Sequence, residues 1–148
     1  MISKETADRF LAGPALGLVG ASRSSRKFGN LALKTLLAKG YRVYPVHPVA
    51  ADIDGVKCVR SVAEIPEPVS ALIVVVPPAQ AINVVRDAHA AGIHHVWLQQ
   101  GSESPAVLKV CRDLGVEVIA GECVLMFAQP TSYHWVHARL RKLFSRAA

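Results

Sequence analysis

The residues best suited to chemistry in this sequence follow a glycine near the amino terminus. Gly20 ends an apolar run, and the next eight residues are Ala21, Ser22, Arg23, Ser24, Ser25, Arg26, Lys27 and Phe28. A glycine at the end of a strand lets the backbone approach a phosphate, whose negative charge is favoured by the N-terminus of the following helix. Serine hydroxyls and basic side chains are donors suited to a pyrophosphate or a ribose phosphate. The segment predicts a phosphate-binding loop, and the alternative is a basic, solvated turn.

Two familiar nucleotide-binding motifs are absent from the sequence around this loop. A dinucleotide fingerprint needs G-x-G-x-x-G and an acidic residue near the end of the second strand. The next glycine after Gly20 is Gly29, and the second apolar run ends in Val46-His47-Pro48. The sequence also has no G-x-x-x-x-G-K-[ST] motif. NAD and nucleoside triphosphates are therefore less favoured than other phosphate-bearing ligands.

The elements that must position this loop alternate between apolar runs of strand length and segments of helical period, which is typical of parallel βαβ units. Strands are predicted at residues 15–19, 41–46, 71–76, 95–99 and 116–120, and helices at 29–39, 79–91 and 104–114. The buried face of the first helix is predicted to be Leu31, Leu33, Leu36 and Leu37. Between the second and third strands we expect a turn at Asp54-Gly55, a short extended piece near 57–59 and a helical turn at 61–65.

This pattern predicts an α/β, Rossmann-like three-layer sandwich with a doubly wound, mainly parallel sheet of about five strands. We expect one domain over residues 1–148, in which 129–148 form a basic C-terminal helical extension. Ligands of such sheets lie beyond the carboxyl ends of the strands. The other strand ends therefore add candidate binding residues, namely His47, Pro48, Val76, Pro77, Pro78, Gln99 and Gln100.

The net charge of +6 and the pI near 9.6 favour an anionic partner. Small phosphorylated ligands, nucleic acids and acidic surfaces are all partners of this kind. The amino terminus lacks the long apolar stretch of a secretory signal, and no apolar run approaches the roughly 18 residues of a membrane span. Three widely spaced cysteines argue against a disulfide framework. These features predict a cytoplasmic protein.

Six short motifs together resemble a known family. They are Val19-Gly20-Ala21-Ser22, Lys27-Phe28-Gly29-Asn30, Tyr44-Pro45-Val46-His47-Pro48, Val76-Pro77-Pro78, Trp97-Leu98-Gln99 with Gly101, and Gly121-Glu122-Cys123. From about Leu16 to Phe127 the chain is similar to stand-alone CoA-binding proteins related to the CoA-binding domain of the succinyl-CoA synthetase alpha subunit. In that family asparagine is usual where this chain has His47.

The resemblance implies that coenzyme A or an acyl-CoA is the ligand. It would bind with its phosphates at the loop from Gly20 to Arg26. The residues His47-Pro48 and Pro77-Pro78 would flank the nucleotide, and Gln99 would lie toward the pantetheine arm. Ligases of this superfamily work through a phosphorylated histidine in a further domain, and the residues of this chain show no catalytic set. The favoured function is non-catalytic CoA binding, as a carrier, a sensor or a partner of an acyl-CoA enzyme, with a homodimer left open.

Two other functions remain as alternatives. An NAD(P)-dependent reductase would use Arg23 and Arg26 to hold a 2′-phosphate, but it lacks the glycine fingerprint. A nucleic-acid-binding protein would explain the pI and the basic tail, but the aromatic residues are not clustered among the basic ones.

Cys123 could form a mixed disulfide with the thiol of CoA, because it comes near the end of the last predicted strand. The favoured interpretation is that it is a small, buried apolar residue, which is common for cysteine. No metal site is predicted, since the paired His134 and His137 lack a third ligand.

Overall fold

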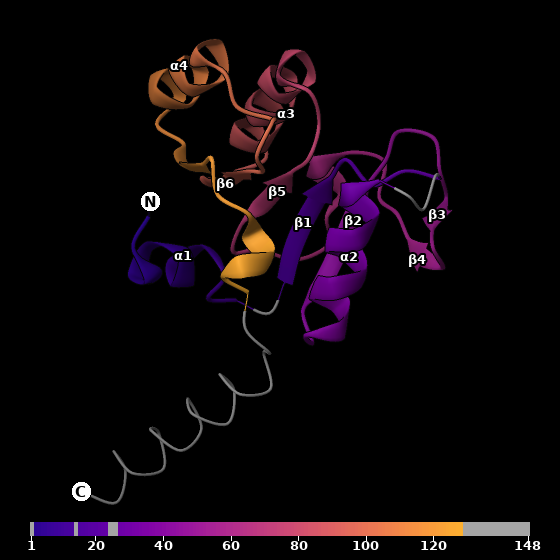
Figure 1. The fold of residues 1–148 in the computed structure, drawn as a ribbon. Helices are drawn as coiled ribbons and strands as arrows, with labels where there is room; N and C mark the ends of the chain where they lie inside the picture. Colours follow the sequence, from indigo (N-terminus) through magenta and orange to yellow (C-terminus); the bar gives the residue numbers. More distant parts are fainter. Residues whose placement is uncertain (1, 14, 24–26, 129–148) are drawn as a thin grey trace, which may run out of the picture.

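Five parallel strands form the central sheet of the computed structural model, which describes residues 2–13, 15–23 and 27–128 (Figure 1). In sequence order the strands are β1 (Ala15–Val19), β2 (Arg42–Val46), β5 (Leu72–Val74), β6 (His95–Leu98) and β7 (Glu117–Ala120). Their order across the sheet is β2-β1-β5-β6-β7. The chain thus fills one side of β1 first and the other side later, which confirms the predicted doubly wound sheet. The predicted C-terminal helix at 129–148 lies outside the described residues.

Three helices run between strands where the hydrophobic period predicts them, namely α2 (Phe28–Ala38), α3 (Pro78–Ala90) and α4 (Pro105–Leu114). The structure also has α1 (Lys4–Phe10) before β1 and the short 3-10 helices η1 (Val62–Glu64) and η2 (Val124–Met126). Proline occupies the first position of both α3 and α4. A backbone N–H at this position would have no hydrogen-bond partner within the helix, so its absence in proline costs nothing there. The side chain of Ser104 caps α4 by accepting a hydrogen bond from the backbone N–H of Val107.

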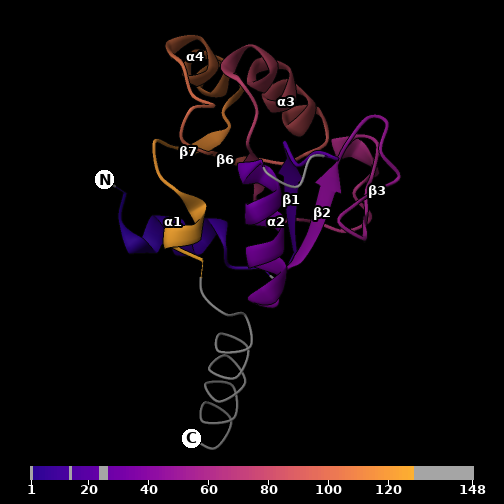
Figure 2. The same ribbon diagram turned by 45° about the vertical axis from the view of Figure 1, so that its right-hand side comes forward.

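The sheet is covered on both faces, so its strands carry apolar side chains on both sides. Leu16, Leu18, Ile73, Trp97 and Ile119 belong to a core shared with α1, α2 and η2. The alternate residues Leu72, Val74, Val96 and Leu98 belong to a second core shared with α3 and α4. This alternation follows from the two-residue period of a strand. Figures 1 and 2 show α3 and α4 together on one side of the sheet and α1 and α2 on the other, the predicted three-layer arrangement.

The predicted buried face of α2 is wrong in one position. Leu31 is 53% exposed, whereas Leu33 and Leu36 are buried as expected and Leu37 is partly buried. The helix turns residues 29, 32, 33 and 36 toward the sheet, a set with helical spacing in which the small residues Gly29 and Ala32 take the place predicted for Leu31. Leucines alone do not mark this face, because small residues occupy part of it.

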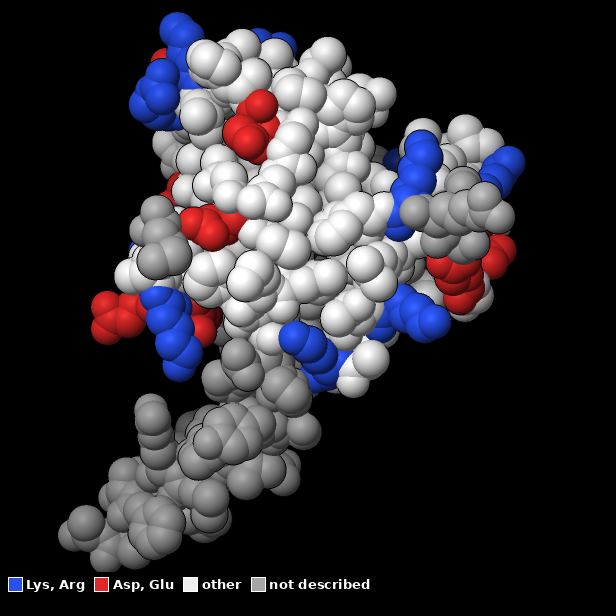
Figure 3. All heavy atoms as spheres, in the orientation of Figure 1, with Lys and Arg blue, Asp and Glu red and all other residues white. Residues whose placement is uncertain are grey.

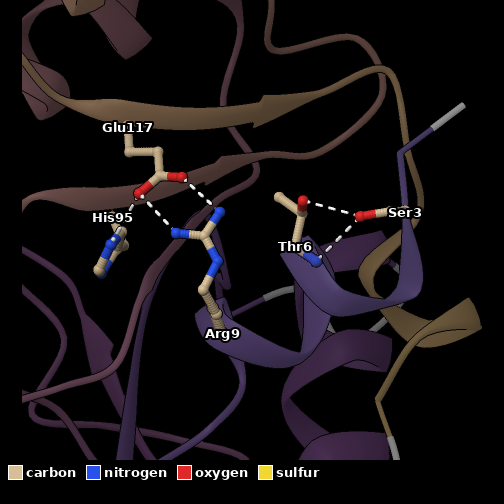
Figure 4. Close-up of polar contacts among 5 residues, drawn as sticks. All are labelled: Ser3, Thr6, Arg9, His95 and Glu117. Atoms are coloured by element: carbon tan, nitrogen blue, oxygen red, sulfur yellow. Dashed lines mark hydrogen bonds and ion pairs between the residues drawn. The ribbon is translucent and has the colours of Figure 1, made fainter.

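Helix α1 was not predicted, and it covers the sheet at the side of β6 and β7. Its first turn is capped by Ser3, whose Oγ accepts a hydrogen bond from the N–H of Thr6 (Figure 4). Arg9 donates to both carboxylate oxygens of Glu117 at 2.8 and 3.4 Å, but this exposed pair is worth at most about 1 kcal/mol. Phe10 is fully buried, so the hydrophobic effect holds the helix in place with about 1.5–3 kcal/mol.

A short antiparallel hairpin follows β2. It consists of β3 (Asp52–Ile53) and β4 (Val56–Lys57), joined by the predicted turn at Asp54 and Gly55. Both turn residues have positive φ angles, 49° and 81°, as a two-residue hairpin turn requires. Among the described helices, none is long and apolar enough to cross a membrane.

Candidate ligand site at the carboxyl ends of the strands

The loops after β1 and β5 meet where the strand order reverses. The chain leaves β1 toward α2 on one face of the sheet and leaves β5 toward α3 on the other face. The N–H of Val75 donates to the carbonyl of Val19 at 2.7 Å, so the two strand ends stay paired up to this point. A crevice outside the carboxyl ends of the strands at such a reversal is the general ligand site of open α/β sheets.

Gly20 lies at this reversal and has no room for a side chain. Its φ angle is 124°, and a Cβ added there would lie 2.1 Å from the carbonyl oxygen of Val75. Both the conformation and the close backbone contact therefore require glycine. This places the start of the predicted phosphate loop directly against the loop after β5.

Gly29 brings the first turn of α2 close to the backbone at the start of the predicted phosphate loop. A Cβ on Gly29 would lie 2.5 Å from the carbonyl oxygen of Gly20 and 2.8 Å from the backbone nitrogen of Ala21. The sequence places Gly29 at the start of the predicted helix and in one of the family motifs, but sequence reasoning missed this packing role. The signal was present, because a glycine inside a helix costs about 1 kcal/mol relative to alanine and needs a reason.

The side chain of Asn30 holds the backbone of the predicted phosphate loop. Its Oδ1 accepts a hydrogen bond from the N–H of Ser22 at 3.0 Å, and its Nδ2 donates to the carbonyl of Ser22 at 2.7 Å. Asn30 is only 2% exposed, so these bonds form away from water. Asn30 belongs to the quoted Lys27-Phe28-Gly29-Asn30 motif but was not predicted as a site residue.

The remaining residues of the loop divide into buried and exposed positions. Ala21 is buried, Phe28 packs partly against the core, and the cationic Arg23 and Lys27 are exposed. The predicted residues Ser24, Ser25 and Arg26 lie outside the described residues. On the face shown in Figure 3, the lysine and arginine side chains are spread apart and form no single broad basic patch.

His47 and Pro48 follow β2, and the imidazole of His47 organises their turn. Its Nδ1 accepts hydrogen bonds from the N–H of Val49 at 3.1 Å and of Ala50 at 2.9 Å. A side-chain amide oxygen two residues before a turn can accept the same bonds. With Nδ1 accepting both bonds, Nε2 is the ring nitrogen that carries the proton.

The loop after β5 is tied to the loop after β6. The N–H of Val76 donates to Oγ of Ser102 at 3.1 Å, and Ser102 is buried. Pro77 and Pro78 then begin α3. Sequence reasoning did not identify Ser102, since a single serine after Gly101 gives no pattern to recognise.

Gln99 and Gln100 join the end of β6 to the segment after β7. Oε1 of the buried Gln99 accepts a hydrogen bond from the N–H of Val124 at 3.1 Å, whereas the exposed Gln100 donates through Nε2 to the carbonyl of Gly121 at 3.1 Å. Cys123 is half-buried at the start of η2. The described residues contain no group of three or more His, Cys, Asp or Glu side chains placed to hold a metal ion.

The comparisons with known proteins agree with this fold. Residues 15–129 match the family model of the CoA binding domain, which covers more than half of the chain. The protein is thus a Rossmann-like domain of the nucleotide-binding type. It belongs to the CoA-binding domain family.

Three similar proteins show the range of this family. A conserved hypothetical protein of Pyrococcus furiosus is 40% identical, with a TM-score of 0.74 over 77% of this chain and 98% of its own. The protein YneT of Bacillus subtilis is 26% identical, covering 74% of this chain and 81% of its own. The alpha subunit of an ADP-forming acetate–CoA ligase II of Pyrococcus furiosus is 27% identical over 79% of this chain. The match spans 28% of that subunit's length.

Proposed function

We propose that this chain binds coenzyme A or an acyl-CoA at the carboxyl ends of its strands and does not itself catalyse a reaction there. The observation that carries the proposal is the contact between Gly20 and Val75 at the strand reversal, where a Cβ on Gly20 would lie 2.1 Å from the carbonyl oxygen of Val75. A site built by backbone contacts of this kind can bring N–H groups close to a ligand's phosphates. The family match supports coenzyme A as this ligand.

The chemistry of the loop residues fits such a ligand. CoA carries a pyrophosphate and a ribose phosphate, and the loop carries the exposed cations of Arg23 and Lys27. His47 and Pro48 on one side and Pro77 and Pro78 on the other would flank the nucleotide, with the pantetheine arm running toward Gln99. Roles as a carrier, a sensor or a partner of an acyl-CoA enzyme are consistent with a relative that is a ligase subunit.

Titration calorimetry with CoA, acetyl-CoA, NAD and NADP tests the proposal. The expected result is binding of CoA or acetyl-CoA with a clear preference over both nicotinamide cofactors. Arg23→Ala should weaken CoA binding, since it removes a cation beside the loop. Lys34→Ala, which removes an exposed charge from the middle of α2, is the matched control and should have little effect. A preference for NADP, or equal effects of the two variants, would overturn the assignment of this loop.

A further inference from the structure

The side chain of Asn30 joins the loop after β1 to a hairpin turn 24 residues further along the chain. Besides its two bonds to Ser22, Nδ2 of Asn30 donates to Oδ2 of Asp54 at 3.0 Å. Asn30 comes from the first turn of α2, Ser22 from the loop after β1, and Asp54 from the β3–β4 turn. The hairpin is therefore connected to the loop through one buried amide.

The three bonds determine which way the amide of Asn30 points. Oδ1 faces the N–H of Ser22, while Nδ2 faces both the carbonyl of Ser22 and the carboxylate of Asp54. A carboxylate oxygen accepts hydrogen bonds, so Asp54 favours the orientation in which Nδ2 faces it. If the amide were reversed, its oxygen would meet two acceptors and its nitrogen would meet an N–H. Asp54 thus reinforces the orientation that the two bonds to Ser22 already favour.

The hairpin holds the carboxylate of Asp54 in a defined place. Asp54 has a φ angle of 49°, in the left-handed region that aspartate tolerates better than most residues. Ile53, immediately before it, is 1% exposed and anchors the turn in the core. Asp52, on the same hairpin and exposed like Asp54, has no hydrogen bond to Asn30.

A negative charge beside a phosphate-binding loop opposes the binding of an anion. Electrostatics alone would therefore disfavour Asp54 at this position. We propose that Asp54 is a positioning residue of the loop, acting through Asn30 to hold the backbone of Ser22 in the conformation that accepts the ligand's phosphate. This inference rests on the proposed function, because it assigns a role within the same site.

Four variants separate the hydrogen bond from the charge. Asp54→Ala removes both, and Asp54→Asn removes the charge but keeps an oxygen that can accept from Nδ2 of Asn30. Asp52→Ala and Asp52→Asn remove the neighbouring charge and serve as controls. We expect Asp54→Ala to weaken CoA binding by about tenfold, the loss that corresponds to one hydrogen bond of about 1.4 kcal/mol. Asp54→Asn should bind within about threefold of the original protein, as should both Asp52 variants.

The position of the loop is also measurable without any ligand. The amide resonance of Ser22 in a nitrogen–proton NMR spectrum should shift in Asp54→Ala and should return toward its original place in Asp54→Asn. If CoA does not bind at all, the proposed function fails, while the Ser22 resonance still tests the positioning role. An unchanged Ser22 resonance in Asp54→Ala overturns the inference. So does a loss of affinity in Asp54→Asn or in Asp52→Ala as large as in Asp54→Ala.

Discussion

The backbone of Gly29 lies against the carbonyl of Gly20, so that a Cβ on Gly29 would come within 2.5 Å of that oxygen. Gly29→Ala should therefore displace the loop from α2, because neither neighbour is a flexible side chain. We expect CoA affinity to fall at least about tenfold, since displacing the loop would remove the phosphate contacts that we propose for it. Titration calorimetry on the folded variant measures this loss.

The control for Gly29→Ala is Ala32→Gly in the next turn of α2. It should lower the free energy of unfolding by about 1 kcal/mol or more through helix propensity, and leave CoA affinity nearly unchanged. Tight CoA binding by Gly29→Ala would contradict the packing role of this glycine.

The side chain of Gln99 should matter for stability as well as for the proposed ligand. Gln99→Leu leaves the N–H of Val124 without its partner in a buried place, which should lower the free energy of unfolding by about 1–3 kcal/mol. Gln100→Leu removes an exposed bond to Gly121 and should change stability by less than about 0.5 kcal/mol. Urea denaturation of both variants checks the difference. Equal effects would show that the buried bond adds nothing beyond a surface one.

Acid should weaken a polar cluster on the edge strand β2. Glu67 accepts hydrogen bonds from Arg42 at 2.7 Å and from the hydroxyl of Tyr44 at 2.7 Å, and these bonds lower the pKa of the Glu67 carboxyl. A carboxyl whose pKa is lower in the folded state stabilises the folded protein at pH values above its unfolded pKa of about 4.3. This stabilisation is lost as the pH falls through the folded pKa.

Glu67→Gln should accordingly be less stable than the original protein at pH 7, and the difference should shrink at low pH. Urea denaturation at pH 7 and at low pH measures this difference in the free energy of unfolding. Glu5→Gln, at an exposed position of α1, is the control. A difference that does not depend on pH would rule out the ionised carboxylate as its source.

The three cysteines should differ in reactivity. Burial raises the pKa of the Cys58 and Cys111 thiols, so at pH 8 both carry less of the reactive thiolate. Cys123 is half-buried, and we expect iodoacetamide to alkylate it first. Peptide mass spectrometry gives the order of labelling, and faster labelling of Cys111 would contradict the burial argument.

Incubation with CoA disulfide tests the mixed-disulfide interpretation of Cys123. The Cys123 thiolate would attack one sulfur, form a Cys123–CoA disulfide and release one molecule of CoA thiol. Intact-mass spectrometry should show an adduct that disappears in Cys123→Ser. Without an adduct, Cys123 is only a small packing residue.

The strands and helices of the central fold could be predicted because each carries its own local signal. The run from Leu72 to Val74 is apolar on both faces, and the period of α3 and α4 is clear. Helix α1 was missed because the seven residues from Lys4 to Phe10 bury only Ala7 and Phe10, which is too few to show a period.

The strand-end loops could be placed from the sequence, but the contacts that hold them could not. Asn30 bonds to Ser22 eight residues earlier and to Asp54 on a separate hairpin, and Ser102 bonds to the N–H of Val76 across two strands. Such bonds depend on where the folded backbone brings distant segments together. The composition and the hydrophobic period carry no information about which distant segments meet, so the roles of Asn30 and Ser102 were found only in the structure.

The family match begins at residue 15, yet Phe10 is fully buried and its ring centroid lies 6.3 Å from that of Trp97. A fragment cut at the family boundary would therefore expose the indole of Trp97, and an exposed aromatic surface of this kind promotes aggregation. Anyone who transplants this domain into a fusion protein should keep α1 with it.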